Sequence, residues 1–295
     1  MEKIKLITDS TCDLNKELIE ELDLEIIPLV VSFEDDDRTY KDGIDITSDD
    51  IYEHVKKTGK LPVTGAVGPG VFEETFNKYI EDGYSVIYTG IGSKLSSAFQ
   101  SAAIGKDNSM DPSKVTLIDS NNLSSATGIV LLKIRDFINQ GLSRDEIKQK
   151  IDKEVTPFLR ASFCIDTCDY LVKGGRCSSL TGFLVKTLNI KPIIVVQDGK
   201  LVTGKKPIGN LNIAIKTQYL DLMKEYDNID LDYLMITGFK TETADAFVTK
   251  LLEQNTKFKH IYHSCPGSVI TSHCGPGTIG LLYLTKPVEK KKKRK

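Results

Sequence analysis

The sequence predicts an α/β protein built from two α/β domains. The first domain is expected to hold a mostly parallel, helix-covered sheet, and the second a mixed sheet with a hairpin. The chain has 295 residues, 40% of them hydrophobic, which is enough for two cores of ordinary size. Strand-like and helix-like segments alternate along it, as in βαβ units. Asp198-Gly199 between two apolar runs is a strong hairpin signal.

In the first half, short apolar runs predict strands, and apolar residues at helical spacing predict helices. Strands are expected at 4–8, 26–33, 84–91 and 114–119, with Pro28 suggesting an edge or a bend in the second. Helices are expected at 14–22, 49–57, 69–80, 97–104, 124–139 and 142–155. Three of these helices begin with known start signals: Thr47 with Asp50, Pro69, and Ser143 with Glu146.

The charged run at 144–158 is expected to end the first domain. This gives domains at 1–157 and 158–286, followed by a basic tail at 287–295. The second domain is expected to contain the hairpin at 193–204, a helix at 209–226 and a strand at 231–239, then a further helix. A strand at 260–264, a short apolar and glycine-rich segment, and a strand at 278–284 complete it.

Composition and charge exclude several classes of function. The net charge is −2, with basic and acidic residues interspersed, which argues against nucleic acid as the main partner. The run KKKKRK at the end is expected to be solvated and to make at most transient contact with a membrane surface. Neither a signal peptide nor an apolar stretch of about 18 residues occurs, so we expect a cytoplasmic protein. Neither glycine-rich nucleotide-binding motif is present.

The six cysteines are expected to be reduced thiols in that compartment. A zinc site would have to draw on Cys164, Cys168 and Cys265 with His263 or His273. Cys-x-x-x-Cys without a second close pair is a poor match to the spacing of structural zinc sites. We therefore expect neither a metal nor a cofactor.

Hydroxyl groups and glycines gather where strands are expected to end. The segments are 8–13, 61–70, 89–96, 118–125 and 272–280. In an open α/β sheet the carboxyl ends of the strands are where ligands bind. Hydroxyls and backbone N–H groups at helix starts suit an anionic oxygen. The alternative is that Asp9, Ser10, Thr11, Ser96 and Asp119 only cap helices.

Four motifs, in order and spacing, resemble those of the DegV family of bacterial fatty-acid-binding proteins. They are TDSTCDL, IGSKLSSAFQSA, DYLVKGGRCS and HCGPGTIGL. The resemblance covers essentially the whole chain. It implies two α/β domains around a long apolar tunnel that holds one fatty acid, with the carboxylate between the domains. It also implies a role as the binding subunit of a fatty-acid kinase, which phosphorylates the carboxyl group for phospholipid synthesis, and no enzymatic activity of the chain itself.

The resemblance also implies which residues bind the carboxylate. The family's threonine and serine match Thr64 and Ser93, and the histidine beside the site matches His273. The Gly-Gly-Arg motif, Gly174 to Arg176, is expected to be structural or at an interface. The full set of expected ligand-binding residues is Thr64, Ser93, His273, Ser10, Thr11, Gly65 and Gly275. Two hydroxyls and an imidazole N–H replace the water that a buried carboxylate loses.

Departures from the family pattern keep other functions open. Gly65 and Ala66 replace two polar residues of the family motif, and Ile208 stands where kinase-binding members carry an arginine. A DegV-type carrier of another lipid or small molecule, with no kinase partner, therefore remains possible. It also remains possible that His273 is a core histidine that contacts no ligand.

An acyl-ester hydrolase is a further alternative, with Ser93 as nucleophile, His273 as base and Asp9 or Asp119 as its partner. Against it, Ile91-Gly92-Ser93-Lys94-Leu95 is not the Gly-x-Ser-x-Gly elbow.

Overall fold

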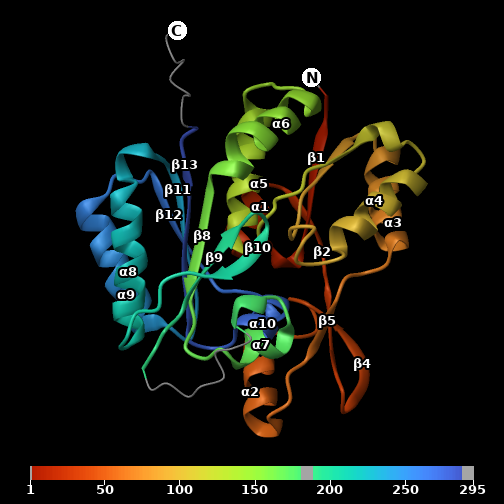
Figure 1. The fold of residues 1–295 in the computed structure, drawn as a ribbon. Coiled ribbons are helices and arrows are strands. Elements are labelled where there is room, and N and C mark those ends of the chain that lie inside the picture. Colours follow the sequence, from red (N-terminus) through yellow and green to blue (C-terminus); the bar gives the residue numbers. More distant parts are fainter. Residues whose placement is uncertain (1, 181–188, 288–295) are drawn as a thin grey trace.

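The computed structural model describes residues 2–180 and 189–287, and these form three sheets (Figure 1). A four-stranded parallel sheet has the order β2-β1-β6-β7, and a six-stranded mixed sheet has the order β10-β9-β8-β13-β11-β12. A small antiparallel sheet has the order β4-β3-β5. The α/β class, the parallel first sheet and the mixed second sheet agree with the prediction. Residues 288–295 of the basic tail lie outside the described residues.

The parallel sheet contains β1 (Ile4–Asp9), β2 (Leu24–Ile27), β6 (Ser85–Tyr88) and β7 (Val115–Leu117). Around it lie α1 (Lys16–Glu21), α3 (Pro69–Glu81), α4 (Ala98–Asn108), α5 (Ser125–Asn139) and α6 (Arg144–Lys150). Alternate residues of the strands point to opposite faces. On one face Ile7 and Tyr88 pack against Phe72 and Phe76 of α3, and on the other Leu6 packs against α5. Helices therefore cover both faces, and the central strands β1 and β6 are almost entirely buried.

The six-stranded sheet contains β8 (Leu159–Cys164), β9 (Ile193–Gln197), β10 (Lys200–Thr203), β11 (Ile229–Phe239), β12 (His260–Ser264) and β13 (Thr278–Thr285). One face packs against α8 (Leu211–Lys224) and α9 (Glu242–Asn255). The predicted hairpin is confirmed: Asp198 (φ 50°) and Gly199 (φ 74°) form the left-handed turn between β9 and β10. Such a turn matches the twist of the two strands.

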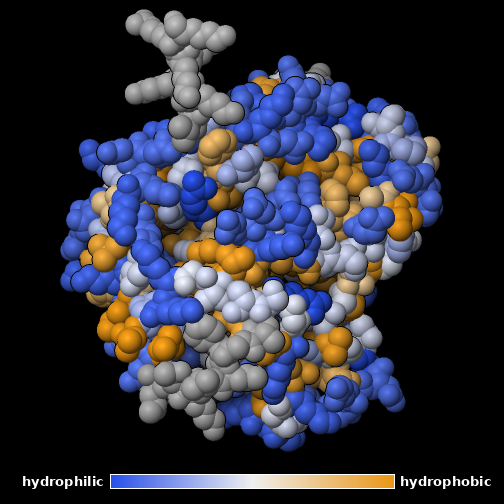
Figure 2. Space-filling model, viewed as in Figure 1, coloured by the Kyte–Doolittle hydropathy of each residue, from blue (hydrophilic) through white to orange (hydrophobic). Residues whose placement is uncertain are grey.

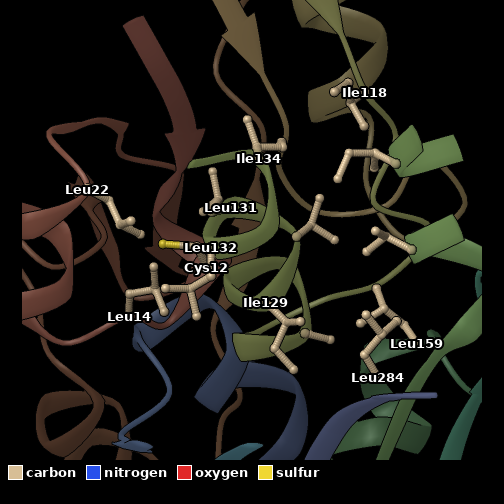
Figure 3. Close-up of a cluster of buried hydrophobic side chains, with 14 of the residues drawn as sticks. Cys12, Leu14, Leu22, Ile118, Ile129, Leu131, Leu132, Ile134, Leu159 and Leu284 are labelled. Carbon is tan, nitrogen blue, oxygen red and sulfur yellow. The ribbon is translucent and has the colours of Figure 1, made fainter. Parts of the chain in front are cut away.

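Helix α5 joins the two large sheets into one core. Every residue from Ser125 to Ile134 is buried, as expected of a helix covered on all sides. Its Ile129 and Leu131 belong to the same cluster as Leu159 and Leu284 of the second sheet (Figure 3). The buried ammonium group of Lys133 lies 2.8 Å from Asp230 and 2.6 Å from Asp232, both on β11. The two halves of the chain are thus packed together through this helix.

The structure departs from the predicted elements at several places. The expected strand 26–33 is broken at Pro28, so β2 joins the parallel sheet, whereas β3 (Val30–Phe33) joins the small sheet. Sequence patterns predicted neither β4 (Asp36–Lys41), β5 (Val63–Gly65), α7 (Asp169–Gly174) nor α10 (Ser268–Cys274). Helix α2 (Ser48–Thr58) has the predicted capping box of Thr47 and Asp50. Helices α7 and α10 lie between the two large sheets and the small sheet (Figure 1).

Short helical turns complete the fold. They lie at Ser10–Cys12, Pro112–Lys114, Ile151–Val155, Thr156–Phe158, Ser178–Leu180 and Tyr226–Asn228. The turn at Ser10–Cys12 directly follows β1, so it brings the TDST motif to the carboxyl edge of the parallel sheet.

Candidate functional site

A cavity of about 110 Å³ lies where the small sheet, α7, α10 and the loop after β6 meet. Most of its wall is apolar, with side chains such as Leu29, Leu171 and Leu201. Its polar residues are Thr64, Ser96, Ser97, Arg176 and His273. Figure 2 shows hydrophilic side chains over most of the surface, with apolar side chains gathered in small patches, some of them near the middle of this face. The cavity combines an apolar wall with a few hydroxyls, one imidazole and one guanidinium, which is typical of ligand sites.

Thr64 and His273 meet in this cavity although 209 positions separate them. The Thr64 hydroxyl lies 2.8 Å from Nε2 of His273. Thr64 is held in β5 by pairing with Val31, and His273 occupies the last turn of α10. Burial, together with the nearby charge of Arg176, lowers the pKa of His273 from 6.5 to about 4. The imidazole is therefore neutral at pH 7 and offers one N–H donor.

The other ring nitrogen of His273, Nδ1, is buried and makes no hydrogen bond to the described residues. It faces α7, where a Cβ atom at Gly174 would lie only 2.4 Å from it. Glycine at position 174 therefore lets the imidazole approach the backbone closely. A buried polar atom without a hydrogen-bond partner is unusual.

Ser93 lies apart from Thr64 and His273, whereas the resemblance implies that the three residues bind the same carboxylate. Its side chain is exposed and does not line the cavity, and its N–H donates to Asp119 over 3.2 Å. The N–H groups of Leu95 and Ser96 both donate to the carbonyl of Gly92, so the chain turns sharply here. This turn points Ser93 outward and brings Ser96 and Ser97 to the cavity.

Ser10 and Thr11 also lie away from the cavity, contrary to the prediction that they bind the ligand. Thr11 is fully buried and donates both its N–H and its hydroxyl to the carboxylate of Asp9. The Ser10 hydroxyl accepts the N–H of Leu29. The alternative that these residues only cap helices fits Asp9, whose side chain caps the turn at Ser10–Cys12, but not Ser10, which bonds to the chain before β3.

The two glycines predicted to contact the ligand differ. Gly65 lines the cavity beside Thr64. Gly275 does not line it: it ends α10 with φ 73°, and a Cβ there would lie 2.6 Å from the ring of Tyr170. Gly275 is therefore needed for the turn and for the close packing of α7 against α10.

Arg176 was expected to be structural or at an interface, but it lines the cavity. Its side chain is exposed, and Nη1 donates to the carbonyl of Gly174 over 2.7 Å. Arg176 therefore places one positive charge at the edge of the cavity.

The hydrolase arrangement is not formed. Nε2 of His273 is bonded to Thr64, and Nδ1 has no partner among the described residues, so neither nitrogen holds Ser93 or a carboxylate. Asp9 accepts from Thr11, Tyr88 and Ile91, and Asp119 accepts from the backbone of Ser93 and Asn121. Within residues 2–180 and 189–287, no group of three potential metal ligands comes together. The helices of that part of the chain are all too short or too polar to cross a membrane.

A second cavity of about 30 Å³ continues the first toward the six-stranded sheet. Its lining is almost entirely apolar and includes Phe163 and Leu282. Leu123, Ile270 and Cys274 line both cavities and separate them. The resemblance implies one long tunnel, and the structure instead shows two small cavities in line, divided by three side chains.

Comparison with known proteins identifies the family. A family profile described as "Uncharacterised protein, DegV family" matches residues 3–286. A DegV domain-containing protein of Clostridium acetobutylicum is 33% identical over 97% of this chain and 100% of its own length. A protein of Thermotoga maritima named "Fatty acid-binding protein" is 29% identical over 94% of this chain and 96% of its own.

A solved structure of a stearic-acid-binding protein from Eubacterium ventriosum superposes with a TM-score of 0.83 at 26% identity, covering 97% of this chain and 99% of the other. The family match spans both large sheets and all the motifs discussed above. The chain therefore belongs to the DegV family.

Proposed function

We propose that this protein binds one long-chain fatty acid, with the carboxylate at Thr64 and His273 and the acyl chain along the apolar walls. The observation that carries the proposal is the 2.8 Å contact between Thr64 and His273 in the wall of a mostly apolar cavity. The fatty acid named for the relatives from T. maritima and E. ventriosum supports the same ligand class.

The polar end of the cavity can replace the water around a carboxylate. In the tautomer with the proton on Nε2, the imidazole donates to the Thr64 hydroxyl, which can in turn donate to the carboxylate. Because His273 is neutral, the site buries no second charge. In this proposal Ser96 or Ser97, both of which line the cavity, donates the hydroxyl hydrogen bond that the resemblance assigns to Ser93. Arg176 adds a positive charge at the exposed rim, where solvent weakens but does not remove its attraction for an anion.

The apolar wall supplies most of the affinity. Removing about fifteen methylenes from water contributes on the order of 12 kcal/mol before costs, at about 0.8 kcal/mol for each. The two cavities, about 110 and 30 Å³, are smaller than the roughly 300 Å³ at which ligand pockets usually begin. A fatty acid therefore has to push Leu123, Ile270 and Cys274 apart and join the two cavities. This rearrangement subtracts from the gross gain.

The finer role that we propose is presentation of the carboxyl group to a fatty-acid kinase. The polar end of the cavity adjoins the exposed residues Ser97 and Arg176, so the carboxyl group would lie near the surface while the tail is covered. Ile208 stands at the position where kinase-binding members of the family carry an arginine, and its side chain is 72% exposed. Acyl phosphate formation by a fatty-acid kinase and ATP, with the loaded protein as substrate, tests this role. Binding without phosphorylation would leave a fatty-acid carrier.

Extraction of natively purified protein with organic solvent, followed by mass spectrometry, tests the ligand class. We expect a long-chain fatty acid at close to one equivalent, and much less from Thr64→Val purified in the same way. A different lipid at one equivalent, or equal amounts of fatty acid from both proteins, would contradict the proposal. Reloading the stripped proteins with a fatty acid provides the control for loss during purification.

A further inference from the structure

Helix α10 forms a large part of the site but has no cap of its own. Val269, Ile270, His273 and Cys274 of this helix all line the cavity. The helix has only seven residues, and its N-cap is Gly267, which has no side chain. A helix this short does not hold its shape by itself. Contacts from elsewhere in the fold must therefore fix its position.

Two carboxylates from the first half of the chain take the place of the missing cap. Oδ1 of Asp13 accepts the N–H of Gly267 at 2.8 Å. Oδ1 of Asp42 accepts the N–H of Ser268 at 2.7 Å and also its hydroxyl. Both carboxylates are buried, with Asp13 5% and Asp42 2% exposed. A Cβ at Gly267 would lie 3.0 and 3.1 Å from the two carboxylate oxygens of Asp42, so glycine at 267 permits this close approach.

Two buried carboxylates are more than a helix cap requires. One serine or asparagine side chain would satisfy the same N–H groups without the cost of burying charge. Oδ2 of Asp42 is buried without a hydrogen-bond partner among the described residues, and burial raises the pKa of Asp13 well above its usual value. Burying these carboxylates costs free energy, but charge-assisted hydrogen bonds are short and directional. We therefore expect the gain to be a fixed position of α10.

Asp13 also forms a hydrogen bond to the segment that carries Leu123, a residue that lines both cavities. Its Oδ2 accepts a hydrogen bond from the hydroxyl of Ser124. Ser124 has φ 55° and ψ −148°, a conformation that residues other than glycine rarely adopt. It directly follows Leu123, which lines both cavities together with Ile270 and Cys274 of α10. One carboxylate thus ties α10 to the segment that carries Leu123.

We infer that Asp13 and Asp42 are positioning residues, which set α10 against the first half of the chain and so place His273 beside Thr64. The effect on fatty-acid affinity rests on the proposed function. The effect on the environment of His273 does not depend on the proposed function. The experiment therefore measures the His273 pKa and the fatty-acid affinity separately.

The test compares Asp42→Ala with Asp42→Asn. The alanine variant removes the acceptor for both donors of Ser268, whereas the asparagine oxygen can keep both bonds. In Asp42→Ala we expect the pKa of His273, followed by NMR of the imidazole, to rise from about 4 toward 6.5. We also expect fatty-acid affinity to fall about tenfold, as for one or two lost hydrogen bonds. Asp42→Asn should restore both quantities.

Asp45→Ala is the matched control, because Asp45 lies three residues away in the same loop, is exposed and accepts the N–H of Lys41. It should change neither quantity. If Asp42→Ala behaved like Asp45→Ala, the inference would be wrong. A moved pKa in a protein that binds no fatty acid would keep the inference and refute the proposed function. Should Asp42→Ala fail to fold, Gly267→Ala crowds the same carboxylate and should move the His273 pKa in the same direction.

Discussion

Two polar clusters, one at the end of β1 and the other between β5 and α10, show opposite states of hydrogen bonding. Around Asp9, every donor finds an acceptor: both carboxylate oxygens are occupied by groups of Thr11, Tyr88 and Ile91. Around His273, one nitrogen bonds to Thr64 and the other has no partner among the described residues. Only the second cluster faces a cavity. The first is built to hold strands together, and the second retains capacity for a ligand.

Replacing Asp9 should give the largest effect, and it should fall on stability. In Asp9→Ala the donors of Thr11, Tyr88 and Ile91 remain buried without an acceptor. We expect the free energy of unfolding to fall by about 4 kcal/mol, several times the value of one hydrogen bond. Urea denaturation measures this. If the free energy of unfolding fell by less than about 1 kcal/mol, the cluster around Asp9 would not be a major stabilising element, and the contrast with the cluster around His273 would be wrong.

The low pKa of His273 should appear as a dependence of stability on pH. Between pH 6.5 and about 4 the unfolded chain binds a proton at this residue that the folded protein does not. The contribution of neutral His273 to the free energy of unfolding is therefore fully present above pH 6.5 and is lost as the pH falls toward 4. The loss should be about 3 kcal/mol, at about 1.4 kcal/mol for each pH unit.

Unfolding curves of the wild type and His273→Gln at pH 7 and pH 4.5 provide the measurement. The difference between the two proteins should shrink or reverse at the lower pH. If the stability of both proteins changed equally over this range, His273 would not be the group responsible.

Replacing Thr64 should affect binding and leave stability almost unchanged. Thr64→Val keeps the shape of the side chain in β5 but removes the donor to the ligand and the partner of His273. We expect fatty-acid affinity to fall by about ten- to a hundredfold, with stability changed by less than about 1 kcal/mol. Thr39→Val, at an exposed position of the same small sheet, is the control for titration with a fluorescent fatty acid.

The serines of the loop after β6 should show the smallest effects. Ser93→Ala should leave affinity within about twofold of the wild type, because its exposed side chain does not line the cavity. Ser96→Ala or Ser97→Ala should weaken binding by about three- to tenfold through a lost hydroxyl. If Ser93→Ala weakened binding most, the sequence assignment would be right and the loop would have to rearrange around the ligand.

Local signals predicted much of the fold. Capping boxes at Thr47 and Ser143, a proline at the start of α3 and the Asp198-Gly199 turn all act within a few residues, so the printed sequence reveals them. Helix α10 was missed because its serine, threonine, valine and isoleucine residues make it a poor helix in isolation. Its cap comes from Asp13 and Asp42, more than 200 positions earlier in the chain.

The site was predictable only in part, for the same reason. The family motifs indicated Thr64 and His273, which the structure brings together. Ser93 does not line the cavity with them, because a turn at Gly92 decides which serine of the loop faces inward, and residue spacing does not report that turn. Arg176 was missed because its place beside the cavity depends on how α7 packs against α10.

The central claim is that Thr64 and His273 receive the carboxylate of a fatty acid. The most direct measurement is ¹³C NMR of carboxyl-labelled palmitate added to stripped protein. We predict one bound carboxylate signal at one equivalent, accompanied by a shift of the His273 imidazole nitrogens, and in Thr64→Val a displaced carboxylate signal without the imidazole shift. A bound signal that is identical in the wild type and Thr64→Val, with the imidazole unchanged, would contradict the claim.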